Sequence, residues 1–77
     1  MFRTGYEIFV SKLSELEEGK ELQKEIRDAK TYQRKMVRAV FSPSAEKLPD
    51  GEQLWVRGYL GPLVDKKPWR IKIISET

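Results

Sequence analysis

The stretch WRIKIIS, residues 69–75, is the clearest β-strand in the chain. Its apolar residues Trp69, Ile71 and Ile73 alternate with two cations. This two-residue period is typical of a strand with one buried and one solvated face. We therefore expect a sheet whose apolar side faces a core and whose basic side faces outward.

Two earlier segments, residues 36–41 and 53–60, are also rich in β-forming side chains. A turn between them is predicted at Leu48–Glu52, because proline fixes φ and Asp-Gly tolerates positive φ. A second turn, Asp65–Pro68, precedes the last strand. The pattern indicates a three-stranded antiparallel sheet with strands at about 36–41, 53–60 and 69–75, although residues 36–41 also fit the last turns of a helix.

The first part of the chain has a helical spacing instead. Its apolar residues recur at intervals of three and four: Tyr6, Phe9, Val10, Leu13 and Leu16. A second stripe, Leu22–Ala29, begins out of phase with the first. Residues 4–33 therefore form either two helices separated at Gly19 or one helix that continues through it. The predicted fold is α+β, with one or two N-terminal helices packed on the C-terminal three-stranded antiparallel sheet.

The composition bounds the function. With 77 residues there is room for one small domain, and the chain has no Cys and no His. These absences exclude disulfides, thiolate zinc sites and nucleophiles paired with histidine. We expect no catalytic residue, no metal site, no cofactor and no enzymatic activity. No apolar run approaches the ~20 residues that span a bilayer, and the N-terminus has no signal-peptide pattern. We therefore expect a cytoplasmic protein without membrane contact.

The net charge of +3 is unevenly distributed, with −1 over residues 1–30 and +4 over residues 31–77. On the predicted sheet, the side opposite the core carries four cations, two aromatic residues and no acid: Arg38, Trp55, Arg57, Tyr59, Arg70 and Lys72. Aromatic rings stack on bases, and cations neutralise phosphates. We therefore predict a small binding module with nucleic acid as its favoured ligand.

Three alternatives use the same residues differently. Tyr, Trp and Arg are also enriched at protein hot spots, so the chain could be a protein-interaction domain that regulates or inhibits a larger protein. The same residues could instead have a purely structural role, with cationic side chains lying over aromatic rings on neighbouring strands and no ligand bound. A one-residue shift in strand register would also turn Trp55 toward the core. A homodimer could form through the helical stripes at Phe9–Leu16 and Leu22–Ala29.

A weaker resemblance concerns the second half of the chain. The pair Lys47-Leu48 is followed by Leu54-Trp55-Val56-Arg57, after a predicted helical segment. This order resembles the small bacterial toxin ribonucleases of the RelE type. The resemblance implies cleavage of messenger RNA by Arg, Lys and Tyr side chains. It also implies that Arg57→Ala would abolish such cleavage.

Overall fold

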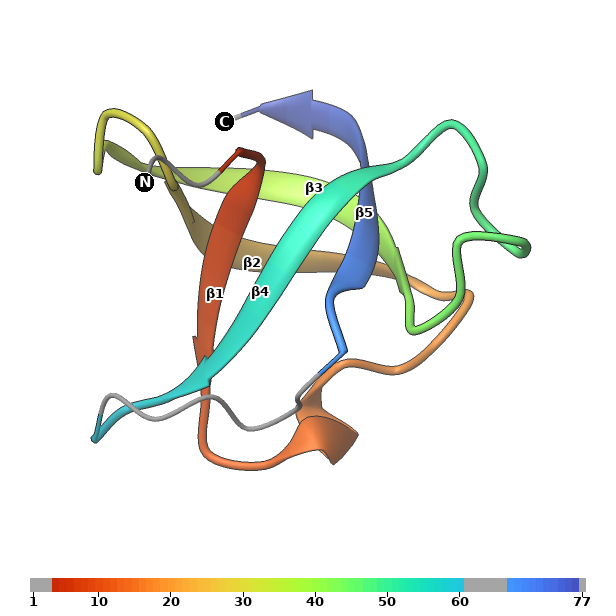
Figure 1. Ribbon diagram of the computed structural model, residues 1–77, viewed down its shortest axis with the longest axis horizontal. Helices are drawn as coiled ribbons and strands as arrows, with labels where there is room; N and C mark the ends of the chain where they lie inside the picture. Colours follow the sequence, from red (N-terminus) through yellow and green to blue (C-terminus); the bar gives the residue numbers. More distant parts are fainter. Residues whose placement is uncertain (1–3, 61–66, 77) are drawn as a thin grey trace.

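The structure, a computed structural model, describes residues 4–60 and 67–76 and forms a closed five-stranded β-barrel (Figure 1). Its elements are β1 Tyr6–Val10, the 3-10 turn η1 Leu13–Glu15, β2 Glu21–Asp28, β3 Arg34–Ser42, β4 Glu52–Gly58 and β5 Trp69–Glu76. Around the barrel the strands follow the order β1-β2-β3-β5-β4. Neighbouring strands are antiparallel except for β1 and β4, whose parallel pairing closes the barrel.

The predicted α+β fold is wrong. Within residues 4–33, which were predicted to be helical, the chain forms β1 and β2, and the single turn η1 is the helical element of this described segment. In β1 the buried Ile8 and Val10 alternate with Glu7 and Phe9, which face outward. The three- and four-residue spacing therefore combined residues from both faces of a strand with residues from the following turn. The pairing of these residues with strands distant in the sequence determined their secondary structure, and the helical spacing of the local sequence did not.

Two further predictions depended on the helices and are also wrong. Gly19 breaks no helix: it lies in the turn before β2 with φ 80°, and its N–H donates to the Phe41 carbonyl at 3.1 Å. The helical stripes at Phe9–Leu16 and Leu22–Ala29 do not exist as such, so they cannot form a homodimer. The resemblance to the toxin ribonucleases depended on helices before strands, and the barrel removes that basis as well.

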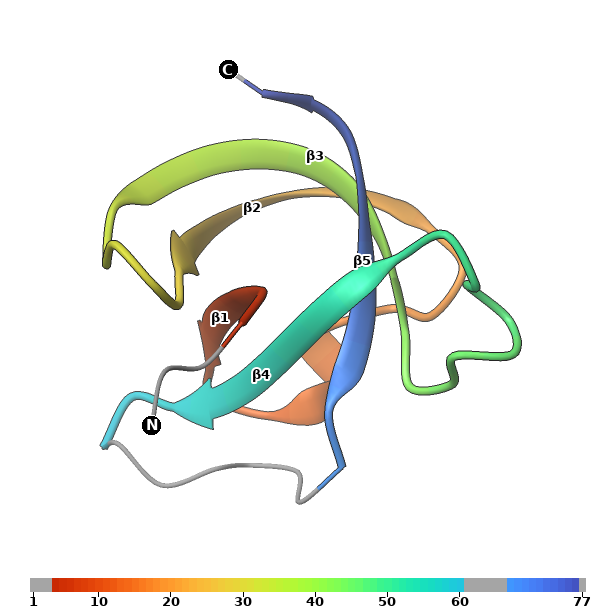
Figure 2. The same cartoon turned by 45° about the horizontal axis from the view of Figure 1, so that its top comes forward.

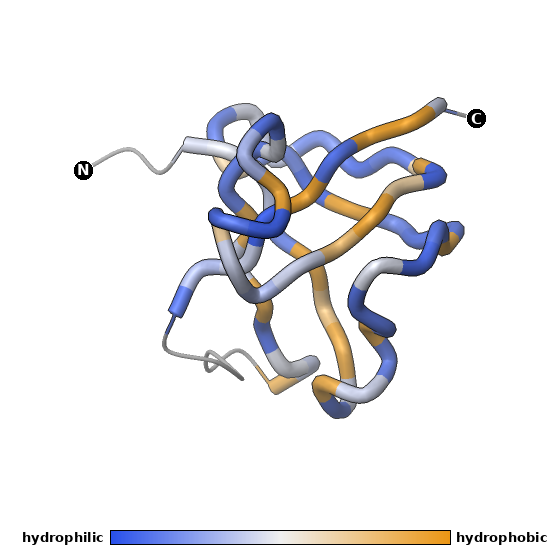
Figure 3. The backbone as a smooth tube through the Cα atoms, turned by 90° about the vertical axis from the view of Figure 1, so that its right-hand side faces the viewer, coloured by the Kyte–Doolittle hydropathy of each residue, from blue (hydrophilic) through white to orange (hydrophobic). Residues whose placement is uncertain are grey.

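The last three strands lie close to their predicted positions, and their inward faces are as expected. Val37, Ala39 and Phe41 are fully buried in β3. The inward residues of β4 and β5 complete the core together with η1 and its flanks: Leu54, Val56, Trp69, Ile71, Leu13 and Leu16. Buried and more exposed residues alternate along much of these strands, and hydrophobic and hydrophilic segments are interspersed along the backbone (Figure 3). The strand alternation in the sequence therefore identified this part of the core correctly.

Gly5 allows the barrel to close. It precedes β1 with φ +89°, a conformation that residues with a Cβ rarely adopt. A Cβ at this position would lie 2.1 Å from the Gln53 carbonyl oxygen of the neighbouring strand β4. The Gly5 carbonyl also accepts a hydrogen bond of 3.0 Å from the Ala29 N–H. The chain can enter the space between β2 and β4 because glycine leaves room for both backbones.

Gly5→Ala is expected to destabilise the protein by roughly 3 kcal/mol, because the new methyl group meets backbone and the positive φ becomes strained. Gly19→Ala is the matched control. Gly19 also has a positive φ, but nothing lies within 4 Å of its added Cβ, so the expected loss is only about 1 kcal/mol. Urea unfolding of both variants measures the difference. Equal losses would show that the close approach of Gly5 to β4 does not limit closure.

Candidate functional site

A buried carboxylate lies on the outer side of β1. Glu7 is only 3% exposed, and it lies between Arg27 of β2 and Arg57 of β4. Arg27 donates to Glu7 Oε1 from Nη2 at 2.7 Å and from Nε at 3.0 Å. Arg57 Nε donates to the other oxygen, Oε2, at 2.5 Å. Each carboxylate oxygen is therefore bound by a different guanidinium.

The strand registers produce this arrangement. β1 lies between β2 and β4, with Glu7 opposite Arg27 and Phe9 opposite Arg57. A charge removed from water is costly unless it is paired and hydrogen-bonded, and here one acid is shared by two cations. The side chains of Arg27 and Arg57 are only 25% and 18% exposed. This ion-pair triad therefore fixes both arginines in place across three strands.

Aromatic rings surround the triad. The Arg27 guanidinium carbon is 4.9 Å from the centroid of the Phe9 ring and 5.2 Å from that of Tyr32. Tyr32 and Tyr59 are 66% and 70% exposed, so their rings are accessible to a partner. Together these residues form what we call the aromatic–arginine surface: Phe9, Arg27, Tyr32, Arg57 and Tyr59.

The turn between β2 and β3 holds Tyr32 in a strained conformation. Tyr32 has φ 62°, a region that favours glycine or asparagine. The Asp28 carboxylate fixes the turn, since its Oδ1 accepts the N–H groups of Lys30 and Thr31 at 2.8 and 3.0 Å. These hydrogen bonds lower the pKa of Asp28. An exposed aromatic residue held at a costly backbone position is a candidate for a functional role.

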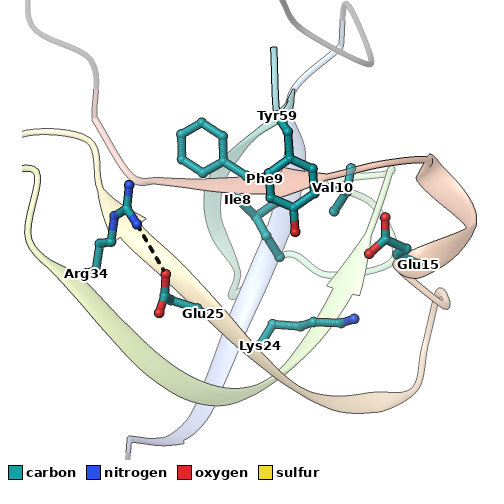
Figure 4. Close-up of a pocket in the computed structure, with 8 residues that line it drawn as sticks. All are labelled: Ile8, Phe9, Val10, Glu15, Lys24, Glu25, Arg34 and Tyr59. Atoms are coloured by element: carbon teal, nitrogen blue, oxygen red, sulfur yellow. Dashed lines mark ion pairs between the residues drawn. The ribbon is translucent and has the colours of Figure 1, made fainter. Parts of the chain in front are cut away.

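A pocket of about 310 Å³ adjoins this surface between β1 and β2 (Figure 4). Figure 4 shows Phe9 and Tyr59 on one side and Lys24 and Glu25 on the other. The complete lining is Ile8, Phe9, Val10, Glu15, Lys24, Glu25, Arg34 and Tyr59. Two of these acids already have partners. The Glu15 carboxylate accepts the N–H groups of Ser11 and Lys12, which lowers its pKa, and Glu25 lies 3.7 Å from Arg34.

The barrel separates the six residues predicted from the sequence. All six side chains lie on its outside, and they divide into two groups: Trp55, Arg57 and Tyr59 in or after β4 beside β1, and Arg38, Arg70 and Lys72 on β3 and β5. Trp55 faces outward, and its Nε1–H donates to the Thr4 carbonyl at 3.2 Å. Only the first group adjoins the aromatic–arginine surface.

Nor is the outer face free of acids, as the sequence suggested. Arg38 Nε lies 3.4 Å from Glu21, and Lys72 Nζ lies 3.9 Å from Asp50. The Arg70 guanidinium donates to the carbonyls of Pro49 and Gly51. The acids come from β2, which was assigned to a helix, and from the turn before β4. A continuous basic face of the kind that we predicted is therefore not present.

Four residues of the site were not predicted from the sequence: Glu7, Phe9, Arg27 and Tyr32. A helical spacing placed Phe9 on the apolar stripe of a predicted helix. The available signal was the alternation of Glu7 and Phe9 with the β-branched Ile8 and Val10. No signal in the sequence pairs Glu7 with Arg27 and Arg57, because that contact depends on the strand registers.

Residues 4–60 and 67–76 contain no cluster of three or more acidic side chains that could hold a metal ion. None of the described helical segments has the length and apolar character needed to span a membrane.

Comparison with known proteins identifies a family. The model of a family described as phenylphosphate carboxylase gamma subunit matches residues 4–77, which is all but the first three residues of the chain. No curated protein and no solved structure matches the chain.

Glu7→Gln is expected to destabilise the protein by about 3 kcal/mol, because it leaves two partly buried guanidiniums without their anion. The matched control is Glu25→Gln. Its ion pair with Arg34 is more than half exposed, so the expected loss is below about 0.5 kcal/mol. Urea unfolding compares the two variants. A loss for Glu7→Gln as small as that for Glu25→Gln would show that the triad does not stabilise the barrel.

Tyr32→Gly is expected to be more stable than Tyr32→Ala by about 1 kcal/mol. Both variants remove the ring and its contact with Arg27, and they differ in their tolerance of the positive φ at this position. Thermal unfolding of the pair isolates the backbone strain from the loss of the ring. The conclusion that Tyr32 is strained would be wrong if the alanine variant were equally stable.

Proposed function

We propose, because the chain belongs to the phenylphosphate carboxylase gamma subunit family, that it is a small non-catalytic subunit of a carboxylase complex. Its function is to bind another subunit of that complex through the aromatic–arginine surface. The observation that carries the proposal is the pair of exposed rings, Tyr32 and Tyr59, beside two arginines that Glu7 holds in place.

The composition of this surface suits a protein partner. Tyrosine and arginine are the residues enriched at protein hot spots, where rings fill pockets of the partner. Arg27 and Arg57 are already ordered by Glu7, so binding costs little further side-chain entropy. The strained Tyr32 is fixed by the Asp28 turn in the same way. The surface is therefore organised before a partner arrives.

The chemistry of the site favours binding over catalysis. Glu7 is buried, and guanidinium hydrogen bonds occupy both of its oxygens, so it is poorly placed to exchange protons with a substrate. In such a complex the carboxylation of an aryl phosphate would be carried out by the other subunits. The small subunit would contribute to assembly or to the geometry of the larger chains.

Protein binding is also better supported than nucleic-acid binding. The family assignment concerns an enzyme subunit. The cations that were predicted to contact phosphates have internal partners: Arg57 with Glu7, Arg38 with Glu21, and Arg70 with backbone carbonyls. Neutralisation of a nucleic-acid backbone requires cations that are available to the phosphates.

Tyr59→Ala is expected to weaken binding to the other carboxylase subunits by about tenfold or more, as truncation of a hot-spot ring commonly does. The matched control is Ile74→Ala on β5. Ile74 is 52% exposed and lies on a strand that is not adjacent to β1. Affinity is measured by calorimetry, or by co-purification when the subunits are expressed together. We expect the control to change the dissociation constant less than twofold.

Two outcomes would contradict the proposal. If the unmodified chain does not associate with the other subunits, the assignment as a carboxylase subunit fails. If it associates but Tyr59→Ala and Ile74→Ala behave alike, the interface lies elsewhere on the barrel. Tyr32→Gly provides a second variant, since it removes a ring of the same surface and relieves backbone strain.

A further inference from the structure

The strands β1 and β2 pair over only a short part of their length. Tyr6 and Glu7 pair with Asp28 and Arg27, and these are the two registered pairs between the strands in the described part of the chain. On their other sides both strands are well paired: β1 with β4 over five residues, and β2 with β3 over seven. The two strands overlap in Figure 1, and the turned view in Figure 2 shows β2 arching away from β1.

This divergence leaves two backbone edges facing an opening. Residues Ile8–Val10 form one edge and Glu21–Ile26 form the other, and neither pairs across the gap within residues 4–60 and 67–76. The pocket of about 310 Å³ lies here, with Ile8 and Val10 of the core in its lining. Unpaired N–H and C=O groups on a strand edge are a template for another strand.

Lys24 gives this opening a preference for an acidic group. It is on the inward side of β2, in phase with Leu22 and the buried Ile26, and it lines the pocket. Its ammonium group forms no ion pair or hydrogen bond with any described residue. The nearby Glu15 is held by backbone N–H groups, and Glu25 is paired with Arg34. Lys24 is therefore a half-buried cation without a direct ion pair, and Glu15, which lines the same pocket, interacts with it electrostatically.

We propose that the opening between β1 and β2 binds an extended segment of a partner subunit. This inference rests on the proposed function and gives its mode of binding. The segment adds as a strand to the edge Glu21–Ile26, places apolar side chains over Ile8 and Val10, and carries a carboxylate that pairs with Lys24. At ~3.3 Å per residue, an edge of this length accommodates a partner segment of about six residues.

Two observations favour this occupant. The charge is complementary, since Lys24 forms no direct ion pair with Glu15, whose carboxylate accepts backbone N–H groups, and can therefore pair with an acidic side chain of the partner. The opening is also continuous with the aromatic–arginine surface, because Phe9 and Tyr59 belong to both. A partner that contacts Tyr59 on the outside can therefore extend a strand into the gap. Backbone hydrogen bonds would supply affinity, and the carboxylate would supply specificity.

The test is amide hydrogen exchange of the chain with and without the other carboxylase subunits. Strand addition is expected to slow exchange across Glu21–Ile26 by at least tenfold, because free N–H groups at this edge gain acceptors. Lys24→Glu is expected to weaken binding about tenfold or more. The matched control is Lys20→Glu, which lies in the turn before β2 with a side chain that is 68% exposed. It should change binding less than threefold.

The outcomes separate this inference from the proposed function. If the subunits do not associate at all, the proposed function fails and the inference with it. If they associate without protection of Glu21–Ile26 and without an effect of Lys24→Glu, only the strand addition is wrong. Protection that instead appears at high concentration of the chain alone, with a dimeric mass in sedimentation, would assign the opening to a second copy and overturn the proposal.

Discussion

The parallel pairing of β1 with β4 is the contact on which the rest of the structure depends. It joins Tyr6–Val10 to Leu54–Gly58 over five registered pairs and converts an open sheet into a barrel. The pairing brings together residues almost fifty positions apart, and it requires the close approach that Gly5 permits. Because β1 lies between β2 and β4, the same contact places Glu7 between the arginines of both strands. The pairing that closes the barrel therefore also forms the ion-pair triad.

The triad and the open edge lie next to each other along β1. On one edge β1 pairs with β4 over five residues, and on its other edge it pairs with β2 only at Tyr6 and Glu7. The contact between Glu7 and Arg27 holds the two strands together at one end. Beyond it they diverge, and Tyr59 and Phe9 come to border the gap. A small barrel can in this way combine a stable core with a length of unpaired strand.

The sequence predicted the part of the fold that local alternation specifies. The strands β3, β4 and β5 show a two-residue period, and their core residues Phe41, Leu54 and Ile71 were assigned to the correct face. β1 and β2 could not be recognised in this way. Tyr6, Phe9 and Val10 happen to follow a helical spacing, and only pairing with the distant β4 shows that Phe9 points outward. The candidate site was the least predictable part of the protein, because the strand register brings its charged residues together. A single sequence does not reveal that register.

The net charge of the chain does not show that its arginines have partners within the fold. All arginines in the described ranges have an internal partner: Arg27, Arg34, Arg38, Arg57 and Arg70. Charges used in this way hold strands together and contribute little to attraction at a distance. The surface proposed to bind a partner presents two exposed tyrosines, an unpaired strand edge and Lys24. Such a surface favours association through apolar contact and backbone hydrogen bonds.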